Sequence, residues 1–160
     1  MEGWNDFFVA TAGAAAALTG LIFVGVSISL TKILSIPGLP NRALLSILLL
    51  LTILIFSGLF LVPKQSNNSV GIEVLSIGTV VWLTILILDI NIYRNRQREF
   101  RRQYILHMVI NQLSITSYLI CGIAILAIGE NGMYWIVPAI IFSFIKSVLD
   151  AWVLLVEIHR

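Results

Sequence analysis

Charged residues are scarce in this chain of 160 residues, because Asp, Glu, Lys and Arg together make up only 11% of it. An ordinary soluble domain carries about a quarter charged residues. Hydrophobic residues make up 59% of the chain, and its mean hydropathy is +0.99. A water-soluble protein of this size still exposes about a third of the surface of its unfolded chain. This composition excludes a water-soluble globular protein and predicts a protein whose solvent is mostly lipid.

Residues that carry covalent and metal chemistry are scarce as well. The one cysteine, Cys121, lies inside a hydrophobic run and can form no intramolecular disulfide. The two histidines, His107 and His159, are far apart, and the chain contains neither a Cys/His metal-binding spacing nor a glycine-rich phosphate loop. The short serine-protease and aspartyl-protease patterns are also missing. We therefore expect no enzymatic activity, no cofactor and no metal site.

Long hydrophobic runs, in contrast, fill most of the chain. Five of them reach the length of about 20 residues that a transmembrane helix needs. They cover residues 7–31, 42–62, 70–93, 104–128 and 133–157. We expect helices, because a backbone in lipid must satisfy its own hydrogen bonds and the alternation of a barrel strand is missing. The sequence predicts an all-α integral membrane protein: one transmembrane domain over residues 1–160, a bundle of five transmembrane helices.

The connections between these runs refine the prediction. The turn before the second run ends in Asn41, which we expect to cap that helix. The connection 129–132 is very short, so the last two helices should be antiparallel neighbours.

Positive charge predicts the orientation of the bundle. The connection between the third and fourth runs contains five arginines: Arg94, Arg96, Arg98, Arg101 and Arg102. Basic connections stay in the cytoplasm, so we expect the N-terminus outside and the C-terminus inside. The same arginines could contact anionic membrane lipids or a protein partner of a membrane complex. One short basic connection does not predict binding of nucleic acid.

Small residues mark the first helix. They recur at steps of three and four, so they share a face: Ala12, Gly13, Ala16, Ala17 and Gly20. Small residues let helix backbones approach each other in lipid. We favour a seam inside one protomer, and the alternative is a subunit interface or pore lining in a homo-oligomer.

Ionisable and polar residues on the last three helices are the candidate functional site. Lys146 and Asp150 lie one helical turn apart at membrane depth, with Ser143 on the same face. The fourth helix carries a polar seam of Tyr104, His107, Asn111, Ser114, Tyr118 and Cys121. With the expected orientation, the polar residues that fall in the cytoplasmic half of the membrane are Asp89, His107, Asn111, Lys146 and Asp150. Such groups in lipid form either a neutralising pair that fixes the bundle or a pathway for ions or protons.

Three segments of the first two helices resemble small multi-pass bacterial inner-membrane proteins without an assigned activity. They are Trp4–Phe8, Ala17–Val24 and Leu61–Gln65. The resemblance implies a location in the bacterial inner membrane and supplies no catalytic or binding residues.

Two functional hypotheses follow. The first is a small oligomeric channel or ion-conducting protein that uses the polar cluster in the cytoplasmic half of the bilayer. The alternative is a non-conducting accessory or scaffold subunit of a membrane complex. A pore requires the charged faces to point at an axis or a cavity, whereas a scaffold requires them to be sealed within one protomer.

Overall fold

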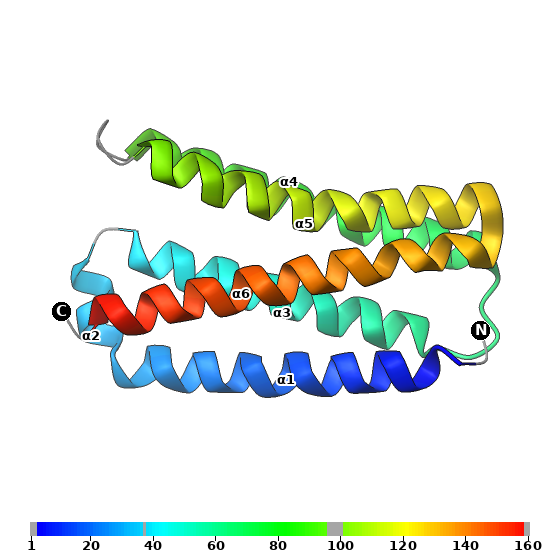
Figure 1. Ribbon diagram of the computed structural model, residues 1–160, viewed down its shortest axis with the longest axis horizontal. Coiled ribbons are helices and arrows are strands. Elements are labelled where there is room, and N and C mark those ends of the chain that lie inside the picture. The colour runs from blue at the N-terminus through cyan, green and yellow to red at the C-terminus, as the bar shows by residue number, and fades with distance from the viewer. Residues whose placement is uncertain (1–2, 37, 96–100, 159–160) are drawn as a thin grey trace.

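The computed structural model describes residues 3–36, 38–95 and 101–158. All the regular secondary structure in these residues is helical. Six of the helices are α-helices and one is a 3-10 helix, η2 (Figure 1). In chain order they are α1 (Asn5–Ile28), α2 (Leu30–Ser35), α3 (Leu39–Phe60), α4 (Asn67–Asn95), α5 (Arg101–Ile128), η2 (Gly129–Trp135) and α6 (Ile136–Ile158).

Four helical stretches of the described chain are long and apolar enough to cross a membrane. They are Asn5–Ile28, Leu39–Phe60, Asn67–Arg94 and Tyr104–Val156. The last stretch runs from α5 through η2 into α6, and the chain reverses its direction at η2, so that α5 and α6 run antiparallel and in contact (Figure 1). By length and composition, this is the fold of a multi-pass membrane protein, and the prediction of an all-α chain is confirmed.

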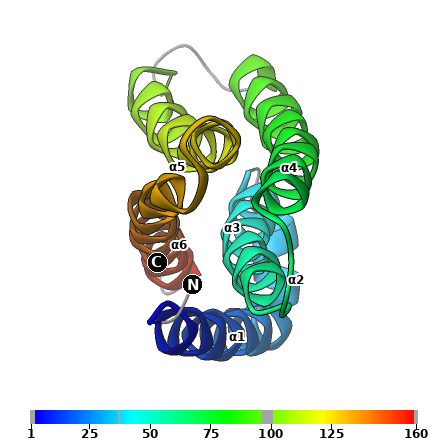
Figure 2. The ribbon, with the colours of Figure 1, turned by 90° about the vertical axis from the view of Figure 1, so that its right-hand side faces the viewer.

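The helices pack in pairs, as the view along the bundle shows (Figure 2). α4 lies against α5, α3 lies against α6, and α1 covers the outer side of α3. α5 also packs on α6 and joins the two pairs, whereas α1 and α6 barely touch. The core between these helices is built mainly from large side chains that are almost completely buried, such as Phe8, Leu49, Phe56 and Tyr118.

Several helix boundaries differ from the prediction. The first helix ends at Ile28 instead of residue 31, and a separate short helix, α2, follows it. The second begins at Leu39, after Gly38 with φ 92°, and Pro40 lies in its first turn. Proline has no backbone N–H group. It is tolerated there because the N–H groups of the first helical turn have no acceptor within the helix. The expectation that Asn41 caps this helix is therefore wrong, since Gly38 holds the N-cap position.

The boundaries of the later helices also shift. α4 and α5 each begin three residues before the predicted runs at 70 and 104. The connection predicted at 129–132 continues as η2 to Trp135, so the last helix begins at Ile136 instead of residue 133. Glycine makes this tight reversal possible: a Cβ on Gly132 would lie 2.3 Å from the backbone carbon of Ala124 in α5.

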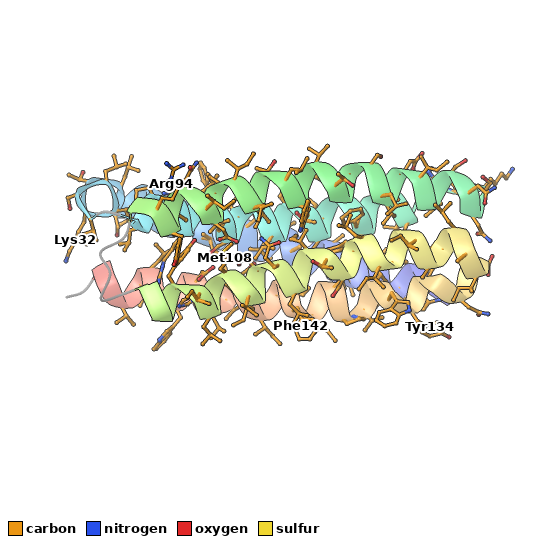
Figure 3. The ribbon with its side chains drawn as sticks, turned by 90° about the horizontal axis from the view of Figure 1, so that it is seen from above. Lys32, Arg94, Met108, Tyr134 and Phe142 are labelled. Carbon is orange, nitrogen blue, oxygen red and sulfur yellow. The ribbon has the colours of Figure 1, made fainter. Side chains whose placement is uncertain are left out.

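The two ends of the bundle have different chemistry. At one end, aromatic rings connect the start of α1 to its neighbours, because Trp4 meets Tyr134 with ring centroids 5.1 Å apart and Phe8 stacks on Phe60 at 4.8 Å. At the other end lie basic side chains, including Lys32 and Arg94, while Tyr134 lies at the aromatic end (Figure 3).

Candidate functional site

Asp89 on α4 is a carboxylate inside the bundle, with no exposed surface. Three side chains of α5 donate hydrogen bonds to it. The Tyr104 hydroxyl and the Asn111 amide donate to Oδ1 at 3.0 and 2.9 Å, and the Gln112 amide donates to Oδ2 at 3.3 Å. A buried carboxylate without partners is costly, so these donors make a charge at this position tolerable. They also hold α4 against α5.

Lys146 and Asp150 form an ion pair between consecutive turns of α6. Each is only 1% exposed. Lys146 Nζ donates to Asp150 Oδ2, while Asp150 Oδ1 lies 3.8 Å from Nδ1 of His107 on α5. The His107 side chain is 29% exposed, so the line from Lys146 through Asp150 to His107 runs from the interior to the surface of the bundle.

Electrostatic interactions connect Asp89 and its donors to the Lys146–Asp150 ion pair, so that they form one charged cluster. Lys146 lies within electrostatic reach of Asp89 on α4 and of Arg42 on α3. We define the charged cluster by the side chains that α3, α4, α5 and α6 contribute: Arg42, Asp89, Tyr104, His107, Asn111, Gln112, Lys146 and Asp150. With His107 neutral, its two carboxylates balance its two cations.

Two buried acceptor atoms in the charged cluster have no hydrogen-bond partner within the described chain. They are Asn111 Oδ1 and Asp150 Oδ1. Buried polar atoms nearly always have a partner, and a missing one requires an explanation such as water or a functional role. Each of these atoms could accept a hydrogen bond from a water molecule or from a protonated group.

The predicted site residues lie largely together. Asp89, His107, Asn111, Lys146 and Asp150 belong to the charged cluster. Ser143 is also buried, but its hydroxyl accepts a hydrogen bond from Tyr118 at 3.3 Å, about one turn before Lys146 on α6.

Sequence reasoning placed Tyr104 on the polar seam of its helix, seven residues before Asn111, but did not assign it to Asp89. It missed two other members of the charged cluster. Gln112 lies beside that seam and only the Asp89 contact reveals its role. Arg42 lies at the start of the second hydrophobic run, and nothing in the sequence shows that its charge acts on Lys146.

The small-residue face of α1 lies elsewhere. Gly13, Ala16, Ala17 and Gly20 are exposed, and Ala12 is half-buried. A Cβ added to Gly13 or Gly20 would meet no atom of the described chain within 4 Å. The favoured interpretation, a seam inside one protomer, is therefore wrong for this face, because α1 packs on α3 through other residues such as Phe8 and Ala15.

The structure describes only part of the basic connection between α4 and α5. Arg94 is exposed at the end of α4, and Arg101 and Arg102 begin α5, while Arg96 and Arg98 lie outside the described residues. Among the described residues, no group of three or more His, Cys, Asp and Glu side chains could hold a metal ion.

Comparisons of the chain with protein-family models, curated proteins and solved structures find no match.

Proposed function

We propose that this chain is a small ion-conducting membrane protein and that its charged cluster carries protons. The observation behind the proposal is the line of Lys146, Asp150 and His107, which connects a buried ion pair at membrane depth to the surface of the bundle. Ionisable groups within transmembrane segments are costly and often mark ion paths or proton relays. A merely neutralising pair would need no connection to a half-exposed histidine.

The packing of the cluster favours protons over larger ions. Asp89, Lys146 and Asp150 are at most 1% exposed, and neighbouring side chains contact them directly. A hydrated metal ion needs a passage of its own width, whereas a proton can move between adjacent donors and acceptors. Asn111 Oδ1 and Asp150 Oδ1, which accept no hydrogen bond from the part of the chain that the structure describes, offer positions for the water molecules that such a transfer uses.

The proposal includes five membrane crossings, with the N-terminus outside and the C-terminus inside. α1 begins and α6 ends at opposite ends of the bundle, as an odd number of crossings requires (Figure 1). Lys32 and Arg94 lie at one end, in agreement with a cytoplasmic basic side (Figure 3). The proposed setting is the bacterial inner membrane, and the exposed small-residue face of α1 offers a surface for assembly into a homo-oligomer.

Proton flux into liposomes tests this proposal. Purified protein is reconstituted with an internal pH-sensitive dye, and a potassium gradient with valinomycin drives protons inward. We expect flux in the wild type and a loss of about tenfold or more in Asp150→Asn, because removing a positioned proton carrier typically costs at least this much. The matched control is Glu73→Gln, which changes a carboxylate bonded to Gln65 at 3.1 Å and far from the charged cluster in sequence and contacts.

Two outcomes would contradict the proposal in different ways. If Asp150→Asn and Asp89→Asn conduct as well as the wild type, protons do not pass through the charged cluster. If folded wild-type protein moves neither protons nor K⁺, Na⁺ or Cl⁻, the protein is not a conductor under any of these gradients.

The second candidate function is a non-conducting accessory or scaffold subunit. One observation favours it. Both carboxylate oxygens of Asp89 accept hydrogen bonds from side chains of the same protomer. In this case the charged cluster fixes the helix arrangement, and the exposed face of α1 binds another membrane protein. A wild type without flux, together with loss of stability in cluster variants, would favour it.

A further inference from the structure

An apolar groove of about 370 Å³ lies between the second half of α1, α2 and the facing sides of α3 and α6. Its walls are almost entirely hydrocarbon, from side chains such as Ile22, Val26, Leu50 and Leu154. Two serines also line it. The hydroxyl of one of them, Ser147, already donates a hydrogen bond to the backbone oxygen of Ser46 at 3.3 Å. The groove therefore offers contact with hydrocarbon and very little hydrogen bonding.

The sequence explains why the groove lies at this place. Near the N-terminus, the aromatic contacts of Trp4 and Phe8 fill the space beside α1. Farther along α1, the residues that line the groove include Gly25, and the residues of α6 that line it include Ser147 and Ala151. Small side chains on both helices leave room between them, and this agrees with the few contacts between α1 and α6.

The position of the groove defines what surrounds it. Gly25 belongs to the stretch Asn5–Ile28, and Ser147 and Ala151 belong to Tyr104–Val156, both apolar enough to cross a membrane. The walls are thus at the depth of the lipid chains. A polar ligand would lose its hydrogen bonds to water there without gaining others. The volume is within the range of about 300–1,000 Å³ typical of ligand sites.

A cation lies next to the residues of α2 that close one end of the groove. Ser29 and Ile33 line the groove, and Lys32 lies between them in sequence on α2 with an exposed side chain. Figure 3 shows Lys32 at the basic end of the bundle. Basic side chains next to a membrane surface attract anionic headgroups. An apolar groove that ends beside a cation is complementary to a phospholipid, whose acyl chain would lie in the groove and whose phosphate would lie beside the cation.

We propose that this groove binds one acyl chain of an anionic phospholipid, with the headgroup beside Lys32. The site is separate from the charged cluster in its chemistry, and the proposal does not depend on ion conduction. It adds a ligand class, a membrane phospholipid held at one position of the protomer rather than exchanging freely around it.

Native mass spectrometry of the protein released from nanodiscs tests the proposal. The nanodiscs contain equal amounts of phosphatidylglycerol and phosphatidylcholine. We expect one retained phospholipid per wild-type protomer, predominantly phosphatidylglycerol. Gly25→Leu should place a side chain into the groove and lower the retained lipid about tenfold, the effect of displacing two methylene contacts. Ala151→Leu approaches from the opposite wall and should have the same effect.

Gly58→Leu is the matched control. It makes the same change at an exposed glycine of α3 that does not line the groove and lies outside the small-residue face of α1. A Cβ at Gly58 or at Gly25 meets no atom within 4 Å, so both variants should fold. We expect Gly58→Leu to retain lipid like the wild type. Lys32→Gln should still retain a phospholipid but lose the preference for phosphatidylglycerol over phosphatidylcholine.

Each alternative outcome overturns a defined part of the proposal. Equal retention by Gly25→Leu and the wild type would exclude the groove as the binding site. Equal loss in Gly25→Leu and Gly58→Leu would indicate lipid that is bound without a defined position on the protomer. A change of protomer number in Gly25→Leu without a change in lipid would make the groove an interface between copies of the chain. An unchanged headgroup preference in Lys32→Gln would remove the lysine from the site.

Discussion

Replacing the buried ion pair of α6 by apolar side chains provides a strict test of how the bundle holds its charges. The variants are Lys146→Met, Asp150→Leu and the double replacement. Both residues are 1% exposed, so loss of either partner leaves the other charge in a medium that solvates it poorly. Breaking such a pair typically costs about 3–5 kcal/mol, whereas replacing both partners by apolar residues is close to neutral.

The neighbours of the pair make the two single replacements unequal. When Lys146 is removed, Asp150 keeps His107 at 3.8 Å, which can take up a proton and restore a cation. When Asp150 is removed, the other charges of the described chain that act on Lys146 are Asp89, whose attraction is more distant and which already accepts three hydrogen bonds, and Arg42, which repels it. We therefore expect Lys146→Met near the lower end of about 3–5 kcal/mol and Asp150→Leu near the upper end.

The free energy of unfolding is measured by titrating protein in mixed micelles with a denaturing detergent and following helix content. The expected order of stability is wild type, double variant, Lys146→Met and Asp150→Leu, with the double variant within about 1–2 kcal/mol of the wild type. If the double variant were as unstable as Asp150→Leu, the two residues would not compensate each other. Equal losses in the two single variants would refute the role given to His107.

Three further expectations can be checked with similar material. Asp89→Asn keeps the size of the side chain but removes its charge, so it should lose about 1.5–3 kcal/mol of stability in the same titration, and an unchanged value would mean that the three donors do not need a carboxylate. Gly132→Ala should lose about 1–3 kcal/mol because its Cβ would lie 2.3 Å from backbone atoms of α5, whereas Gly13→Ala, which meets nothing, should be neutral or slightly stabilising. In a background with Cys121 replaced by alanine, a membrane-impermeant thiol reagent applied to intact cells should label Ser66→Cys and not Ser35→Cys; the reverse pattern would contradict the proposed orientation.

The sequence was sufficient to predict the class of fold, because hydrophobic runs of about 20 residues have few alternatives to helices in lipid. It also predicted which residues of α5 turn inward, since Tyr104, Asn111 and Tyr118 recur at steps of seven and all are buried. The boundaries were less predictable. Gly38 and Pro40 are typical of a turn, although proline is compatible with a first helical turn and the helix begins at Leu39.

Pairing between helices could not be derived from one sequence. The spacing of Lys146 and Asp150 identifies them as neighbours because they share a helix, but the distance between His107 and Asp150 depends on how α5 and α6 pack. The same limit explains the error on α1. Gly13 and Gly20 form a face suited to close packing, yet the residues that meet α3 lie on another side of the helix, and composition alone does not choose between them.

The hydrogen bonds of Asp89 have a consequence for the insertion of the protein into the membrane during synthesis. All three donors to this carboxylate come from α5, between 15 and 23 residues later in the chain. While α4 is being synthesised, its aspartate has no partner, and an isolated carboxylate enters lipid only at considerable cost. α4 should therefore wait in the insertion machinery until α5 has emerged, and the two should enter the bilayer together as a hairpin. The order of synthesis, and not only the final packing, thus determines how this charge reaches the interior of the membrane.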